Sequence, residues 1–293
     1  MYAWRIDNRE PITGASIACN KSLTLLNGDS IVTFVPSDPH EMTSTAPLLI
    51  PDRSRRVAPM IGSPGFTITD LAGVKWVKVG EERNNWIGCH GSQGPSALTD
   101  KIAFLGDAMD NVVILSPSHL YRATFHVSGS RNIALMGSSA LWQSRLTVAF
   151  KGNDNLFFIG DRCAVNDANA TLTCDGCCVV IGDNCMLSSG ITIRTHDEHG
   201  IVDMKTGEWL NPPKNVIVEP HVWIGSGATV RMGTKIGFGS IVGERSVVTR
   251  DVERYTAVAG VPARTIRRDI SWCTHRAAGA QVMMELREFE RSL

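Results

Sequence analysis

Branched aliphatic residues recur at every sixth position through the C-terminal half of the chain. The frame starts at Val218 and runs through six consecutive hexads, with a compact residue four positions after each aliphatic. The aliphatic positions are Val218, Ile224, Val230, Ile236, Val242 and Val248, and the compact positions are Val222, Ala228, Thr234, Ser240, Ser246 and Val252. A period of six fits neither an amphipathic helix nor an alternating strand. It predicts a triangular solenoid in which each hexad forms one side of a coil and its aliphatic side chain points inward.

The same frame appears upstream. IGDRCA begins at Ile159 and IGDNCM begins at Ile181, which places Cys163 and Cys185 at the compact inward position. Before them, NVVILS, ATFHVS and LTVAFK are strand-like, with β-branched and aromatic residues between Gly, Ser and Asn. We therefore expect the solenoid to span residues 106–268.

Glycine follows the inward aliphatic in three of the hexads, at Gly225, Gly237 and Gly243. Each of these glycines stands where the chain has to turn a corner of the prism. We expect backbone angles there that a side chain would oppose.

The two ends of the chain differ from this pattern. Residues 1–105 hold eight of the thirteen prolines and short strand-like pieces without a hexad frame, which predicts an irregular N-terminal β/loop region. In residues 269–293, apolar side chains recur at helical spacing, which predicts a C-terminal amphipathic helix. These residues are Val282, Leu286, Phe289 and Leu293.

Charge and composition restrict the class of function. The chain has 29 basic and 29 acidic residues, so nothing in the total charge favours a nucleic acid or an anionic membrane as partner. We find no apolar run long enough for a transmembrane helix and no apolar core of a signal peptide near the N-terminus. The sequence therefore predicts a cytoplasmic protein without membrane insertion.

The cysteines present two alternatives. Cys174, Cys177 and Cys178 form a C-x-x-C-C cluster that could start a metal site, although no second pair follows at zinc-ribbon spacing. The other reading is that these cysteines are small buried apolar residues, as the hexad frame indicates for Cys163 and Cys185. We expect no metal.

Between residues 195 and 215 the repeat stops and then resumes in frame. An excursion of this length from a regular solenoid is a common place for a binding loop. It contains THDEHGIVDMKTGEWLNP, which is dense in titratable residues. The interpretation as an ordinary surface loop is the less favoured alternative.

This loop and its flanks carry a family resemblance. Residues 156–268, with IGDNCMLSSGITIRTHDEHG, NPPKNVIVEPHVWIG, GTKIGFGSIVGERSVVTRDV and AGVPARTIR, closely resemble the hexapeptide-repeat acyltransferases, and among them the sugar and capsular-polysaccharide O-acetyltransferases. The resemblance implies an all-β fold built on a left-handed parallel β-helix. It also implies acetyl-CoA as co-substrate, a carbohydrate hydroxyl as acceptor, and a homotrimer with active sites between adjacent prisms. The acceptor sugar, and the choice between O- and N-acetylation, stay open.

The resemblance also implies a catalytic histidine. In the family's Arg-Thr-x-Asp-x-His pattern the histidine is the base, and in this chain His199 matches it. Imidazole titrates near ~6.5, so it is suited to taking a proton from a hydroxyl at neutral pH. Asp197 could orient the ring, as the third member of a catalytic triad does. His196 is the alternative base, because it stands where the family generally has a small residue.

Binding residues are carried over by position. For the donor, the resemblance places Ser226 against CoA and basic side chains on its phosphates, and guanidinium groups suit phosphates because they donate in a fixed fork. The donor candidates are Ser226, Thr249, Arg250, Arg264 and Arg267, with Trp223 as a wall of the cleft. The acceptor candidates are Asn166 (or its neighbour Asp167), Asp175 and Asn211. Glu244 and Arg245 depart from the small residues that the family has there.

Two other functions remain as alternatives. A γ-class carbonic anhydrase uses a similar prism with three zinc-binding histidines, for which His126, His196 and His199 are available. Their spacing does not resemble that class. A non-catalytic solenoid that binds glycans is the other alternative, and the intact loop pattern speaks against it.

Overall fold

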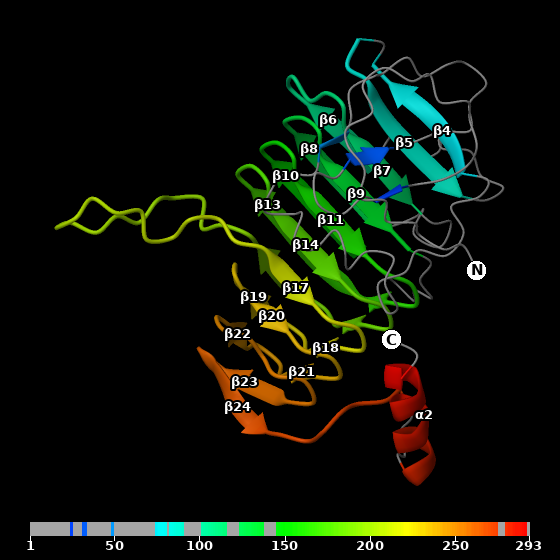
Figure 1. Cartoon of the computed structure of the whole chain (residues 1–293), viewed down its shortest axis with the longest axis vertical. Helices are drawn as coiled ribbons and strands as arrows, with labels where there is room; N and C mark the ends of the chain where they lie inside the picture. The colour runs from blue at the N-terminus through cyan, green and yellow to red at the C-terminus, as the bar shows by residue number, and fades with distance from the viewer. Residues whose placement is uncertain are drawn as a thin grey trace.

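The computed structural model describes residues 24–25, 31–33, 48–49, 74–80, 82–90, 101–115, 123–137, 145–274 and 279–291. Most of them form a left-handed parallel β-helix whose coils stack along one axis (Figure 1). This confirms the predicted fold class. Among the described residues, one helix, α2 (Ala280–Arg291), lies beside the last coils, where the sequence predicted a C-terminal helix. No helix in this part of the chain is long and apolar enough to cross a membrane.

Three sheets form the sides of the prism. The seven-stranded sheet is parallel throughout and has the order β22 (Val247–Val248), β19 (Thr229–Val230), β16 (Ile191–Arg194), β13 (Asp167–Thr173), β10 (Arg145–Lys151), β8 (Ala123–Ser128) and β6 (Ile102–Leu105). The eight-stranded sheet has the order β20 (Lys235–Ile236), β17 (Val216–Val218), β14 (Cys178–Ile181), β11 (Leu156–Ile159), β9 (Ile133–Met136), β7 (Val112–Leu115), β5 (Asn85–His90) and β4 (Val74–Val79). The six-stranded sheet has the order β12 (Ala164–Val165), β15 (Met186–Leu187), β18 (Trp223–Ile224), β21 (Ile241–Val242), β23 (Ala257–Gly260) and β24 (Ala263–Arg267).

The ends of these sheets depart from parallel pairing. β4 and β24 pair antiparallel with β5 and β23. The strands β1 (Thr24–Leu25), β2 (Ile31–Thr33) and β3 (Leu48–Leu49) form a separate antiparallel sheet. Because β5 pairs in parallel with β7, the parallel ladder includes strands before residue 106.

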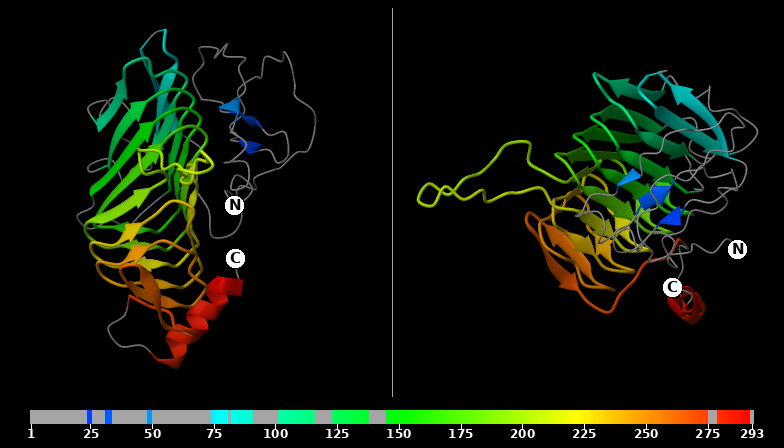
Figure 2. Two further views of the ribbon diagram at one scale, coloured as in Figure 1. Left: turned by 90° about the vertical axis from the view of Figure 1, so that its left-hand side faces the viewer. Right: turned by 45° about the horizontal axis from the view of Figure 1, so that its top comes forward.

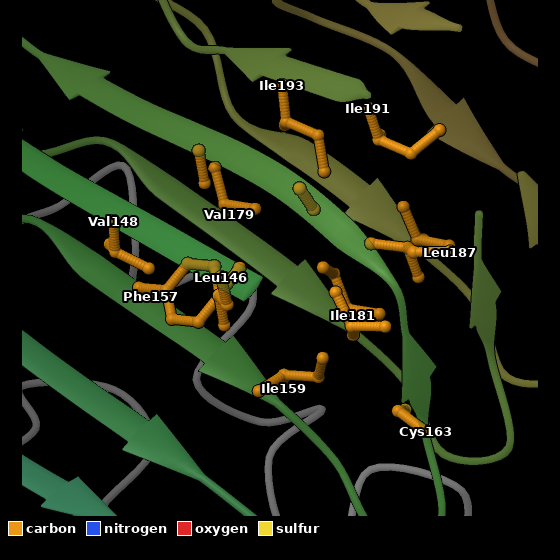
Figure 3. Packing of buried hydrophobic residues seen from close by; sticks show 14 of the residues in the cluster. Leu146, Val148, Phe157, Ile159, Cys163, Val179, Ile181, Leu187, Ile191 and Ile193 are labelled. Atoms are coloured by element: carbon orange, nitrogen blue, oxygen red, sulfur yellow. The ribbon is translucent and has the colours of Figure 1, made fainter. Parts of the chain in front are cut away.

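The hexad aliphatics stack in register, as the sequence predicted. In the eight-stranded sheet Ile159 pairs with Ile181, Ile181 with Val218, and Val218 with Ile236. All four side chains are fully buried, and Figure 3 shows this packing for Ile159 and Ile181 beside Cys163. Burial of one such side chain stabilises the fold by about 1.5–3 kcal/mol. The stability of the prism therefore comes mainly from contacts between neighbouring coils.

The corner glycines are required for a reason other than the one expected. Gly225, Gly237 and Gly243 do not have positive φ values. A Cβ atom at Gly225 would instead lie 2.8 Å from the backbone nitrogen of Glu244, and one at Gly237 would lie 2.6 Å from that of Arg254. The following coil approaches too closely for any side chain, so the constraint is spacing between coils rather than local backbone conformation.

Each pair of sheets meets at a corner. We call the turns from the seven-stranded to the eight-stranded sheet the loop corner, because residues 195–215 leave the prism there. The turns from the eight-stranded to the six-stranded sheet form the His221 corner, and those from the six-stranded to the seven-stranded sheet form the Ser226 corner. Figure 2 shows the projecting segment at 195–215, in yellow-green, on a different side of the prism from α2.

Helix α2 docks at the His221 corner. The ring of Phe289 lies 5.9 Å from Phe238, and Arg254 forms a 3.0 Å ion pair with Glu290. The Tyr255 hydroxyl also donates to Glu290, which, with burial as the larger cause, raises the pKa of Tyr255 to about 12. The helix has no fully buried residue, so it covers the surface of the prism without entering its core. Leu293, a predicted contact of this helix, lies outside the described residues.

Candidate active site

The segment from 195 to 215 is a long hairpin that projects from the loop corner (Figure 1). It leaves β16 and returns to β17, and the Lys214 amide donates to the Thr195 carbonyl (3.0 Å) to close its base. Thr195 is fully buried, and its hydroxyl accepts a 3.1 Å bond from the Thr173 amide one coil earlier. The base of the hairpin is therefore anchored to the prism.

The outer part of the hairpin is ordered by its own bonds. Val202 and Trp209 form an antiparallel bridge, and the Leu210 amide donates to the Ile201 carbonyl at 2.7 Å. The Asp203 carboxylate accepts from the amides of two residues in the tip, which lowers the pKa of this carboxyl. Large apolar side chains remain exposed along the hairpin: Ile201, Val202, Met204, Trp209 and Leu210.

Asn211 joins the two sides of this hairpin. Its side chain is 5% exposed. Its carbonyl oxygen accepts from the Ile201 amide (2.6 Å) and from the Trp209 indole (3.0 Å). Its amide nitrogen donates to the His199 carbonyl (2.9 Å) and to the Asp197 carboxylate (3.2 Å). All four hydrogen-bonding positions of the amide are thus used inside the loop, so Asn211, predicted to bind the acceptor, holds the hairpin in this chain.

Asp197 lies at the base of the same network. One carboxylate oxygen accepts from Asn211, and the other pairs with Arg231, which follows β19 at the loop corner. In the described part of the chain these are its side-chain partners, and the ring of His199 is not among them. The predicted orienting contact between Asp197 and His199 is therefore not made within one chain.

His196 is buried in the hairpin base, 5% exposed, with its ring edge-on to Trp209 at 6.0 Å. Its Nδ1 accepts a 2.9 Å bond from the Glu198 amide. A backbone N–H always donates, so Nδ1 is unprotonated and the neutral ring carries its proton on Nε2. Among the described residues Nε2 has no hydrogen-bond partner. In this position the ring is a hydrogen-bond donor, because the nitrogen that could accept a proton is already occupied.

His199 differs from His196, because it is exposed. Its main chain is held by the bond that its carbonyl accepts from the Asn211 amide. The adjacent Glu198 has a left-handed backbone (φ 68°) and a 2.7 Å ion pair with Lys151, which lowers the pKa of that carboxyl. The exposed imidazole is accessible to a bound hydroxyl, which a general base has to reach.

The predicted donor residues lie on different parts of the prism. Thr249 and Arg250 are exposed at the loop corner, after β22. Ser226 is at the Ser226 corner, where its carbonyl accepts from the Arg245 amide (2.8 Å). Arg264 and Arg267 are exposed on β24, at the C-terminal end of the prism. One chain alone does not bring Ser226 to the hairpin.

Trp223 lies on the outer face of β18 and is 36% exposed. Its indole donates to the Ser188 hydroxyl (3.2 Å), and its ring lies 6.3 Å from Trp272. The side chain therefore forms part of an exposed surface next to the Ser226 corner. Its role as the wall of a cleft stays a prediction.

The remaining acceptor candidates are separated as well. Asp175 is at the loop corner, one coil before the hairpin, and its carboxylate accepts from the Asn153 amide (2.7 Å) and side chain (3.2 Å). Asn166 is exposed at the Ser226 corner. Its neighbour Asp167 binds Arg145 through two hydrogen bonds of 2.8 and 2.9 Å, which lowers the pKa of the carboxyl.

Comparison with known proteins places this geometry in context. No protein-family model matches the chain. It is 36% identical over 125 residues to a polysialic acid O-acetyltransferase of Escherichia coli O1:K1 / APEC, covering 43% of this chain and 40% of that protein. It is 37% identical over 103 residues to the galactoside O-acetyltransferase of Escherichia coli strain K12, covering 34% of this chain and 49% of that protein. The chain is similar to hexapeptide-repeat O-acetyltransferases.

The structural comparison supports the shared fold. The polySia-specific acetyltransferase NeuO superposes with a TM-score of 0.50 at 24% identity, covering 66% of this chain and 99% of that one. The matched segments span half or less of the length of the two curated O-acetyltransferases. The structural similarity thus concerns the fold of the prism.

The sequence did not indicate Arg231 as a site residue. It stands directly after the inward Val230, where the hexad frame places the turn at the loop corner, so the frame does predict that it lies one coil after the hairpin. Its ion pair with Asp197 could not be predicted, because that depends on how the hairpin folds back. Among the described residues no three His, Cys, Asp or Glu side chains gather as a metal site would require.

Proposed function

We propose that this chain is an acetyl-CoA-dependent O-acetyltransferase that transfers an acetyl group to a hydroxyl of a sugar or polysaccharide. The observation that carries the proposal is the hairpin at the loop corner, which presents an exposed His199 on a backbone fixed by Asn211. The similarity to sugar O-acetyltransferases supports the reaction class.

In the proposed mechanism His199 is the general base. Its unprotonated nitrogen takes the proton of the acceptor hydroxyl as the oxygen attacks the thioester carbonyl of acetyl-CoA. A backbone N–H stabilises the tetrahedral oxyanion, and the C–S bond then breaks. The imidazolium of His199 returns the proton to the leaving thiolate, so that the products are the acetyl ester and CoA. The tautomer of His196 favours His199 as the base, because Nδ1 of His196 is bonded to the Glu198 amide.

The donor is expected along the C-terminal coils. Arg264 and Arg267 are exposed and have room to bind the phosphates of CoA, and Arg250 lies at the loop corner on the same coils. Within the described ranges, the Arg264 side chain donates to the neighbouring Ala263 carbonyl, at 2.9 Å, and its guanidinium keeps further donors for a ligand.

The proposed active form is a homotrimer. Ser226 and Trp223 lie away from the loop corner of their own chain, so a second copy would have to bring its Ser226 corner against the hairpin. The apolar side chains exposed on the hairpin suit such a contact, because Met204 is 91% and Leu210 51% exposed in the single chain. The double variant Met204→Glu/Leu210→Glu should sediment as a smaller species than the wild type and lose turnover. A monomeric wild type that is fully active would refute this arrangement.

Thiol release with acetyl-CoA tests the proposed reaction. Purified protein is incubated with acetyl-CoA and a panel of mono-, oligo- and polysaccharides, and products are weighed by mass spectrometry. A product heavier by one acetyl group, labile to mild base as esters are, is the expected outcome. An alkali-stable product would indicate an amide and an N-acetyltransferase. Zinc-dependent hydration of carbon dioxide without thiol release would support the carbonic anhydrase alternative, which the comparisons do not favour.

A further inference from the structure

Among the described residues, Arg231 is the one side chain from another coil that pairs with Asp197 at the base of the hairpin. It follows β19, and β19 pairs with β16, the strand from which the hairpin departs. The ion pair of Arg231 with Asp197 is better shielded than the other ion pair of the hairpin, between Lys151 and Glu198. Side-chain exposure is 32% and 22% in the first pair and 52% and 39% in the second. Shielding strengthens a charge pair, because water screens it less.

The ion pair continues into the hydrogen-bond network of the hairpin. Asp197 accepts from the Asn211 amide, and the same amide nitrogen donates to the His199 carbonyl. The side-chain oxygen of Asn211 also accepts a 2.6 Å bond from the amide of Ile201, which lies on the other strand of the hairpin. The backbone on both sides of Gly200 is therefore fixed by one buried side chain, which is itself bonded to Asp197. Buried networks of this kind are worth more than the sum of their bonds, because each bond orients the next.

This connection has a consequence for the exposed imidazole. His199 is exposed, so we expect the location of its ring to depend mainly on its main chain. Displacement of a catalytic group by about 1 Å can cost about 10²-fold in rate. Loss of the charge on residue 231 would release Asp197, and then Asn211, and so would move the backbone of His199.

We propose that Arg231 is a positioning residue for the transfer reaction, acting on His199 through Asp197 and Asn211. The inference rests on the proposed function, in which His199 is the base. It assigns a task in the reaction to a residue of the regular repeat, one coil beyond the hairpin.

Three variants test it: Arg231→Met, Arg231→Lys and, as the matched control, Lys151→Met, which removes the cation of the hairpin's other ion pair. Arg231→Met should lower kcat about 10–100-fold and leave the KM for acetyl-CoA within about two-fold, because the group acts on the base and not on the donor. Arg231→Lys should recover part of kcat, since it keeps the charge but not the fork. Lys151→Met should stay close to the wild type.

Hydrogen exchange gives a readout that does not depend on activity. Exchange at the Ile201 amide, which donates to Asn211, should be faster in Arg231→Met than in the wild type and unchanged in Lys151→Met. Unchanged exchange and unchanged kcat in Arg231→Met, in a protein that needs His199 for turnover, would refute the positioning role and leave the proposed function intact. If His199→Ala itself keeps full turnover, the proposed function fails, and the exchange result alone then decides whether Arg231 orders the hairpin.

Discussion

Two corners of this prism carry histidines, and they use them in opposite ways. At the His221 corner the ring of His221 stacks on Trp272 (4.5 Å, 5°), its Nε2 bonds to the Trp272 carbonyl (2.9 Å), and the Trp272 indole donates back to the His221 carbonyl (2.8 Å). At the loop corner His199 is exposed, and the hydrogen bond that it receives in the described part of the chain is to its backbone carbonyl. The ring of His221 is therefore engaged in contacts within the chain, while the ring of His199 is accessible to a ligand.

The difference shows how to separate structural from functional polar residues in a solenoid. A group whose polar atoms or ring are engaged within the chain contributes to stability, as the bonded and stacked ring of His221, the Cys163 thiol and the Asn211 amide do. A group whose donors or acceptors stay accessible to solvent can bind a ligand, as the exposed side chains of His199, Arg264 and Arg267 can. Variants of His221 and Cys163 should therefore change stability, and variants of the available groups should change kinetics. Asn211 belongs to both classes, because its filled amide also holds the main chain of His199.

The largest expected effect belongs to His199. His199→Ala should lower kcat by about 10²–10⁴-fold, the usual range for loss of a general base. Acetyl-CoA binding, measured by calorimetry, should persist because the proposed mechanism places the ring against the acceptor hydroxyl and not against CoA. The rise of kcat/KM with pH that a histidine base produces should disappear from the variant.

His196→Ala is the control for this prediction. Nδ1 of His196 is already bonded, so its loss should reduce kcat much less than loss of His199. Should His196→Ala abolish turnover while His199→Ala keeps it, the two roles are exchanged. If neither variant loses activity, the hairpin is not the active site.

The available arginines should affect donor binding. The double variant Arg264→Ala/Arg267→Ala should raise the apparent KM for acetyl-CoA by about 10–100-fold, the equivalent of one or two charge-assisted hydrogen bonds, with a smaller change in kcat. Interactions with a remote part of the donor contribute equally to the ground state and the transition state. Steady-state kinetics at saturating acceptor measures it, and an unchanged donor KM would place the CoA phosphates elsewhere.

A filled group should show the reverse behaviour. Cys163 and Cys185 are buried, and the Cys163 thiol lies 3.1 Å from the Gly182 carbonyl. Cys163→Ala should lower the free energy of unfolding by about 1–2 kcal/mol through the cavity it leaves, with unchanged turnover per folded molecule. Chemical denaturation and a thiol-release assay on the same sample measure both. Bound metal that disappears together with activity in Cys174→Ala or Cys177→Ala would contradict the reading of these cysteines as structural.

The smallest effect concerns pH and the His221 corner. Burial lowers the pKa of His221 below its ordinary value, although the bond to Trp272 partly opposes the shift. The unfolded chain therefore binds a proton more readily, and the stability contributed by neutral His221 is lost as pH falls below about 6.5. Melting curves between pH 8 and pH 5.5 should show a smaller decline in His221→Asn, which keeps a residue that tolerates the positive φ of 56°. Parallel declines in both proteins would mean that another group is responsible.

Much of the fold follows from the sequence because the hexad frame is local and repeated. Ile159, Ile181 and Val218 stack as their spacing predicted, and Cys163 and Cys185 fill the compact positions. The place of the excursion was also predictable, since the frame stops at residue 195 and resumes after residue 215. Handedness did not follow from spacing, and came from the family resemblance.

Only the tertiary structure decided which hydrogen bonds and ion pairs the hairpin makes. The sequence indicates Asp197 beside His199, but whether a carboxylate meets a ring or a guanidinium depends on how the hairpin folds back over the next coil, and here it meets Arg231. The sequence likewise did not predict that the Asn211 amide makes its hydrogen bonds inside the loop. Nor did it predict that His196 is buried, with Nδ1 accepting from the Glu198 amide. A period of six fixes which residues point inward, because each coil repeats the one before it. Contacts made by a segment that leaves the repeat are set by long-range packing, for which no local pattern exists.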